Sequence, residues 1–258
     1  MYTYQKRMQF PIKIKNKNLY MAKMIIAQYG GSNGEMGAAT RYLAQRFTMP
    51  CEKGRSLLTD IGTEELAHVE IIATMVYQIM SNATPVELKA AGLDMVYMGL
   101  ESGADEVLQA VKKGVTADEM IEAGKKVRAA GMILSMTVIS GLGGKKLWRE
   151  HALGSARVIS AIKPEYVGFL TLMIEPGTEM YDQYNRGEIE LLTPHEVLDE
   201  TELFIRSVDA EGTMFRSNHA SNYIPLGGTL NGERDKILGQ IEISRRKSKF
   251  RPDVFRGI

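Results

Sequence analysis

Apolar residues recur at helical spacing in a long segment of the first third of the chain, from Leu57 to Met80. Steps of alternately three and four residues place seven side chains on one face of this segment: Leu58, Ile61, Glu65, His68, Ile72, Met75 and Ile79. The pattern predicts a long amphipathic helix that packs this face against a partner helix. A second helix is predicted at residues 32–47, and Pro50 would end it so that the chain turns back antiparallel.

Two residues of the predicted helix face are polar, Glu65 and His68. A carboxylate on a dry helix face needs a cation, a hydrogen-bond donor or water. Because a Glu and a His three residues apart project from the same side of a helix, this pair has the spacing of the Glu-x-x-His unit in four-helix dinuclear metal sites. The alternative is an internal ion pair without a metal.

Glu35 also has two readings. With Ser32 it has the spacing of a capping box, an ordinary start of a helix. Alternatively, the small residues one turn to either side leave room beside its carboxylate for a metal ion. Glu35, Glu65 and His68 together are half of the ligand set of a dinuclear bundle, which has two Glu and two Glu-x-x-His units. Carboxylate oxygens with imidazole suit manganese or, as the second choice, non-haem iron.

From Asp94 the pattern changes to apolar runs that alternate with helical segments. Buried strands are predicted at residues 95–100, 134–141 and 166–174, and a repeat of about 35 residues predicts parallel strands with right-handed crossovers. In such sheets ligands bind beyond the carboxyl ends of the strands. Those ends carry Glu101-Ser102-Gly103, Gly141-Leu142-Gly143-Gly144 and Glu175-Pro176-Gly177-Thr178. These segments are either ordinary turns or one ligand-binding rim.

Composition narrows the candidate partners. The 258 residues carry a net charge of +1, with 24% charged and 44% hydrophobic residues, which gives no electrostatic reason to expect nucleic acid or membrane as a partner. Neither a signal peptide nor an apolar run of about 18 residues is found, so no transmembrane helix is expected. The single cysteine, Cys51, excludes an intrachain disulfide, suggests a reducing cytoplasmic compartment, and leads us to expect no iron–sulfur cluster.

The segments QYGGSNGEMGAATRYLAQRFTMP and LLTDIGTEELAHVEIIATMVYQI closely resemble manganese catalases, in particular the short spore-coat members of that family. The resemblance covers residues 1–93. It implies a ferritin-like fold, manganese ligands Glu35, Glu65 and His68, hydrogen peroxide as substrate, and the spore coat as an alternative location. The second helix pair of the family, with its own Glu and Glu-x-x-His, does not follow. A homodimer with a two-fold axis would supply it.

The segments VYMGLESGADEVL, VISGLGG, LTLMIEPGT and FRSNHASNYIPLGGTL resemble the C-terminal half of radical S-adenosylmethionine (SAM) enzymes, over residues 87–258. The resemblance implies part of a (β/α) barrel and SAM as a second candidate cofactor, bound at Glu101, Ser102, Gly141 and Gly143. The family's cluster-binding motif C-x-x-x-C-x-x-C and first three strands are absent from these residues, so radical chemistry is not expected of this chain alone. Both resemblances share the phrase ELKAAGLD, as at a join between two partial domains.

The predicted fold is therefore a composite of α+β and α/β classes. Residues 1–83 form a ferritin-like helical hairpin, half of a four-helix bundle, and residues 84–258 form a partial (β/α) barrel of three parallel strands. The predicted function is a manganese half-site completed by homodimerisation, with peroxide disproportionation as the reaction. Two alternatives stay open: a remnant that binds SAM without radical chemistry, and a structural coat protein or chimera without activity.

Overall fold

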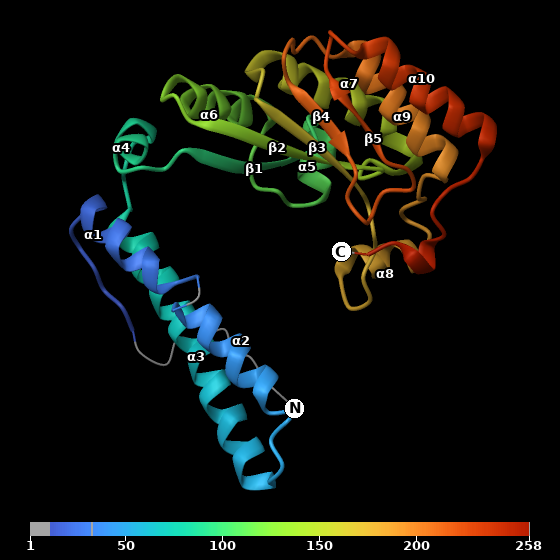
Figure 1. The fold of residues 1–258 in the computed structure, drawn as a ribbon. Helices are drawn as coiled ribbons and strands as arrows, with labels where there is room; N and C mark the ends of the chain where they lie inside the picture. Colours follow the sequence, from blue (N-terminus) through green and yellow to red (C-terminus); the bar gives the residue numbers. More distant parts are fainter. Residues whose placement is uncertain (1–10, 32, 258) are drawn as a thin grey trace. The chain divides into compact units, whose positions relative to one another are not determined.

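The computed structural model describes residues 11–31 and 33–257 (Figure 1). The chain divides into two compact units between Leu93 and Asp94. The sequence placed the join at residues 83 and 84, whereas helix α4 (Pro85–Ala90) lies in the first unit. Among the helices of the described residues, each is too short or too polar to cross a membrane.

The first unit consists of helices. They are α1 (Leu19–Ile25), a 3-10 turn (Ile26–Gln28), α2 (Glu35–Gln45), α3 (Glu52–Ile79) and α4 (Pro85–Ala90). α2 and α3 pack along each other because the short connection at residues 46–51 returns the chain antiparallel. α3 begins at Glu52, near the expected start at Cys51 and ahead of the periodic segment from Leu57, and the Cys51 side chain accepts a hydrogen bond from the Gly54 N–H group at 3.4 Å. α4 begins with the capping box of Thr84 and Glu87 that its sequence indicates.

A glycine sets how closely α2 and α3 approach. A Cβ atom at Gly62 would lie 2.7 Å from the Leu43 Cγ atom, so a larger residue at position 62 would push the helices apart. The predicted inward face of α3 is nevertheless only partly covered: Ile79 is buried, and the other six residues of that face keep some exposure. Within the described part of the first unit, α2 packs along one part of α3, and α1 and the 3-10 turn contact it elsewhere, which leaves part of its apolar face uncovered.

The second unit contains a five-stranded sheet in the order β1-β2-β3-β4-β5. The strands are β1 (Met95–Glu101), β2 (Ile133–Ser140), β3 (Tyr166–Thr171), β4 (Met214–Ser217) and β5 (Leu226–Thr229). β1 to β4 are parallel, and β5 runs antiparallel to β4. The prediction of three strands was therefore incomplete. The two additional strands are four residues long and lack the apolar run that revealed the other three.

Helices cover one face of this sheet. The helices of the second unit are α5 (Asp105–Ala110), α6 (Ala117–Ala129), α7 (Gly144–Ile162), α8 (Glu179–Asn185), α9 (Pro194–Ser207) and α10 (Arg234–Lys247), followed by a 3-10 turn (Asp253–Phe255). α6, α7, α9 and α10 lie over the same face (Figure 1), where Leu134, Met136 and Val138 of β2 are completely buried. On the opposite face Tyr97 is 75% exposed. The strands predicted as buried are therefore covered on one face, since the described part of this unit has no second layer on the other.

Candidate functional site

Glu35 is the first residue of α2, and Gly34 precedes it as the N-cap. A Cβ atom at Gly34 would collide with the Gly30 carbonyl, so a glycine is needed to fold the loop back on itself. The predicted capping box, with Glu35 as the third helical residue after Ser32, is wrong because the helix begins at Glu35 itself; Ser32 lies outside the described residues. The Glu35 carboxylate therefore faces α3 instead of closing a cap.

The structure brings Glu35 of α2 together with Glu65 and His68 of α3. The His68 Nδ1 atom lies 2.8 Å from Glu65 Oε2 and 3.5 Å from Glu35 Oε2. Each residue offers one ligand atom, and these atoms all lie within 4.8 Å of one another. The side chains of Glu65, Glu35 and His68 are 16%, 27% and 42% exposed, so the group is open to solvent on one side.

Electrostatics couple the three groups. A hydrogen bond from one carboxyl group to the other raises the pKa of Glu35, and the same bond lowers the pKa of Glu65, with His68 adding to the lowering. The hydrogen bond to Glu65 raises the pKa of His68. Without a cation, the two carboxyl groups are therefore coupled, and their pKa values move in opposite directions. A metal ion can bind at this point, because two oxygens and an imidazole nitrogen are donors that manganese and iron accept.

The four positions predicted to bind SAM are not all at one place. Glu101 pairs with Lys113 at 3.0 Å, and Ser102 is completely buried. Gly141 lines a cavity of about 280 Å³ beside β2 and β3. Gly143 lines a different cavity of about 180 Å³. Of the four, Gly141 is therefore the one at the larger cavity.

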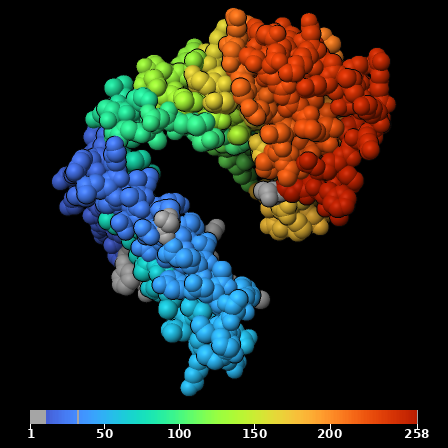
Figure 2. Space-filling model, in the orientation of Figure 1, coloured from blue at the N-terminus to red at the C-terminus, as the bar shows by residue number. Residues whose placement is uncertain are grey.

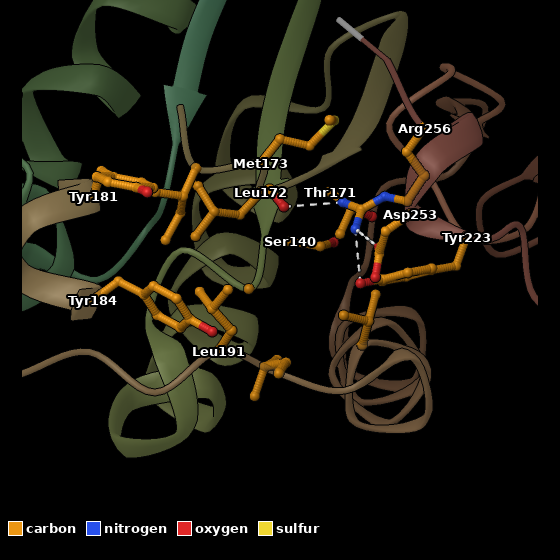
Figure 3. A pocket seen from close by; sticks show the side chains of 14 residues that line it. Ser140, Thr171, Leu172, Met173, Tyr181, Tyr184, Leu191, Tyr223, Asp253 and Arg256 are labelled. Atoms are coloured by element: carbon orange, nitrogen blue, oxygen red, sulfur yellow. Dashed lines mark hydrogen bonds and ion pairs between the residues drawn. The ribbon is translucent and has the colours of Figure 1, made fainter. Parts of the chain in front are cut away.

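The larger cavity has walls that the sequence did not indicate. Figure 3 shows Tyr181 and Tyr184 of α8 on one side, and Tyr223, Asp253 and Arg256 on the other. The Arg256 guanidinium donates to the Leu172 carbonyl at 3.0 Å and to the Tyr223 hydroxyl at 2.7 Å, and it stacks on the Tyr223 ring. Tyrosines in an amphipathic helix and arginines in a basic C-terminal stretch carried no sequence signal for a cavity.

Two buried polar residues behind the cavity were also missed, His151 of α7 and Glu200 of α9; each is 1% exposed. A signal for Glu200 was present: it stands three residues after Val197 and four before Phe204, which places it on the buried face of its helix. Nothing in the sequence could pair it with His151, because that contact joins two helices far apart along the chain.

The family model for manganese containing catalase matches residues 1–140, more than half of the 258 residues. The chain belongs to the manganese-containing catalase family. Protein CotJC of Bacillus subtilis is 52% identical over 102 residues, which are 40% of this chain and 53% of CotJC. A manganese catalase of Bacillus subtilis is 36% identical over 104 residues, which are 40% of this chain and 38% of the relative.

A second group of relatives differs from the catalase family. A tRNA uridine(34) acetyltransferase of Methanocaldococcus jannaschii is 22% identical over 156 residues, 58% of this chain and 27% of the relative. The chain spans about half the length of CotJC and smaller shares of the other two relatives. Both resemblances drawn from the sequence, to manganese catalases and to radical SAM enzymes, are confirmed, and the chain fits a fusion of two parts.

Proposed function

We propose that Glu35, Glu65 and His68 are manganese ligands and form half of a dinuclear site that disproportionates hydrogen peroxide. The observation that carries this proposal is the convergence of the three side chains from two helices onto one point, with their ligand atoms within 4.8 Å. Membership of the manganese-containing catalase family favours manganese over iron. An ion pair between Glu65 and His68 alone would not require Glu35 in the same group.

A second copy of the chain completes the site in this proposal. One chain supplies two carboxylates and one imidazole, and a two-fold axis beside His68 doubles this to the four carboxylates and two imidazoles of a dinuclear bundle. Two observations favour this arrangement: the 42% exposure of the His68 side chain on the open side of the group, and the half-covered apolar face of α3. In the dimer, residues 1–83 form a ferritin-like four-helix bundle from two hairpins.

The chain's own residues have separate tasks in this site. Bound manganese supplies the redox chemistry of the reaction. The contact of His68 Nδ1 with Glu65 Oε2 fixes the orientation of the imidazole ring. The two carboxyl groups, whose pKa values are coupled without a cation, would be the anionic ligands that balance its charge. We expect slow turnover, because a second copy repeats the same ligands without the groups by which the family's second helix pair would orient them.

The test is oxygen release from hydrogen peroxide by the purified full chain after loading with Mn²⁺. Wild-type protein and the control Glu64→Gln, an exposed neighbour on α3, should both release oxygen. Glu65→Gln should not, because it removes a charged ligand. No oxygen release from a manganese-loaded wild-type dimer would reject the catalytic part of the proposal. It would favour a structural protein of the spore coat, in contrast to a cytoplasmic enzyme.

A second candidate function rests on the cavity beside β2 and β3. We propose that the second unit, part of a (β/α) barrel, binds SAM in this cavity without radical chemistry. The cavity lies where the carboxyl ends of two parallel strands meet, beside Ser140 of β2 and Thr171 of β3 (Figure 3). Gly141 brings backbone to its wall. Titration calorimetry of the full chain with SAM tests it. Binding that is lost in Tyr184→Ala supports the proposal, and no heat at millimolar SAM rejects it.

A further inference from the structure

A chain of buried polar groups crosses the second unit beneath the carboxyl ends of β1 and β2. Ser102 follows β1, and its Oγ atom lies 2.8 Å from His151 Nδ1. The His151 Nε2 atom lies 3.8 Å from Glu200 Oε1. That oxygen accepts the Gly141 N–H hydrogen bond at 2.9 Å. The groups therefore connect the end of β1 to the wall of the cavity through α7 and α9.

Two atoms of these polar groups have no hydrogen-bond partner although both are buried: His151 Nε2 and Glu200 Oε2. A buried polar atom without a partner is destabilising, and most such atoms in folded proteins are satisfied. A proton on the Glu200 carboxyl group would face an unprotonated His151 Nε2, which lies 3.8 Å from Glu200 Oε1. The complementary His151 Nδ1–H group would then donate to Ser102 Oγ, which also accepts the Ala104 N–H group at 3.1 Å.

Burial keeps both partners neutral near pH 7. Burial raises the pKa of Glu200 to about 8, although the Gly141 N–H group and the Ser140 hydroxyl oppose that rise. Burial also lowers the pKa of His151 to about 4. A charged pair would require two ions in the protein interior without further counter-charges, which is less favourable than a neutral pair.

We propose that a protonated Glu200 and a neutral His151 form a buried neutral pair, and that Glu200 holds the Ser140–Gly141 wall of the cavity in place through its bond from the Gly141 N–H group. Loss of the proton leaves a buried carboxylate whose only compensation is that wall and the imidazole. The wall then moves closer to the carboxylate, and the imidazole proton moves from Nδ1 to Nε2. The cavity is thus shaped by a protonation state inside the protein.

The groups that face the pair are few among the described residues. The turn after β2 contributes the Gly141 N–H group and the Ser140 hydroxyl, and the turn after β1 contributes the Ser102 hydroxyl. Among the charged residues of α7 and α9, Lys145 pairs with Glu190 at 2.7 Å and lies 3.6 Å from Glu196, and the Lys145 and Glu196 side chains are 35% and 38% exposed. The pKa values of Glu200 and His151 are therefore shifted mainly by the burial of these two residues.

Nuclear magnetic resonance of the full chain tests the proposal. Serine labelled at its carbonyl carbon, combined with ¹⁵N-glycine, selects the two Ser–Gly bonds of the sequence, Ser102–Gly103 and Ser140–Gly141. Ser140→Ala removes, and so assigns, the Gly141 signal. In wild-type protein the Gly141 amide should titrate with a midpoint near pH 8. The signal should stay constant in Glu200→Gln, whose amide oxygen accepts from Gly141 and whose side chain does not titrate.

A control variant and a second readout, the His151 ring shifts, complete the test. Glu150→Gln, an exposed neighbour of His151, should titrate as the wild type does. If Glu200→Gln does not fold, the ¹⁵N shifts of the His151 ring in wild-type protein decide: an Nδ1–H tautomer at pH 7 supports the neutral pair. A Gly141 signal that is constant from pH 6 to pH 9.5 in wild type, or an Nε2–H tautomer at pH 7, overturns it.

Discussion

Substitution of one helical glycine, Gly154→Ala, should destabilise the second unit strongly. Gly154 lies in α7 where the turn after β1 crosses it, and an added Cβ atom would lie 2.5 Å from the Gly103 carbonyl oxygen and 2.6 Å from its carbonyl carbon. The turn cannot move away freely. The Gly103 N–H group donates to Ser155 Oγ at 3.0 Å, and Ser102 contacts His151 at 2.8 Å.

The magnitude follows from the overlap. Non-bonded carbon atoms normally stay about 3.5 Å apart or more, so the alanine overlaps its neighbours by about 1 Å. Overpacking costs about 1–3 kcal/mol, and a buried hydrogen bond left unmade costs about 1–3 kcal/mol more. Alanine gains about 1 kcal/mol over glycine in a helix interior. The net expectation is a loss of about 3 kcal/mol in the free energy of unfolding.

Urea unfolding followed by Trp148 fluorescence measures this loss, since the single tryptophan of the chain lies in α7. The matched control is Gly239→Ala in α10, where an added Cβ atom meets nothing within 4 Å. The control should gain about 0.5–1 kcal/mol. If Gly154→Ala unfolds at the same urea concentration as wild type, or at a higher one, the crossing of the turn over α7 is not as close as described.

Two further predictions concern the second unit. The free energy of unfolding should fall by about 2 kcal/mol between pH 6.5 and pH 8, at about 1.4 kcal/mol per pH unit, because Glu200 is ionised in the unfolded chain but protonated in the folded one. Below pH 6.5 the lowered pKa of His151 acts in the opposite direction, and Glu200→Gln should abolish the fall. Arg256→Gln should lower stability by about 1–3 kcal/mol through its lost hydrogen bonds and speed proteolysis of the C-terminal segment, whereas Arg246→Gln, with a side chain 78% exposed, should do neither. Equal proteolysis rates for the two arginine variants would contradict the role given to Arg256.

The helical spacing of the first unit predicted which side chains share a face of α3, and Glu35 was predicted to join Glu65 and His68. Side-chain directions follow from the helix period, so this part could be derived from the sequence. The partial exposure of that face could not, because a periodic pattern identifies a buried face without giving the number of helices that cover it. The start of α2 at Glu35 also depended on the glycine loop before it.

In the second unit the sequence showed the three long strands but not β4 and β5. Those two strands, with the sequences MFRS and LGGT, are held by pairing to neighbours rather than by an apolar run of their own. The buried pair of His151 and Glu200 was missed for a related reason: the helix period places Glu200 on the buried face of α9 but does not identify a partner on another helix. Their meeting depends on how α7 packs on α9.

The central claim is that Glu35, Glu65 and His68 hold manganese at a site shared by two chains. Its most direct test is the manganese content of the dimer fraction, isolated by size exclusion after reconstitution with Mn²⁺ and measured by mass spectrometry. We predict about one manganese ion per chain, as two half-sites that form one dinuclear site require. We predict the same content in Glu64→Gln and almost none in Glu65→Gln. A wild-type dimer without manganese, or equal metal content in Glu65→Gln, would contradict the account.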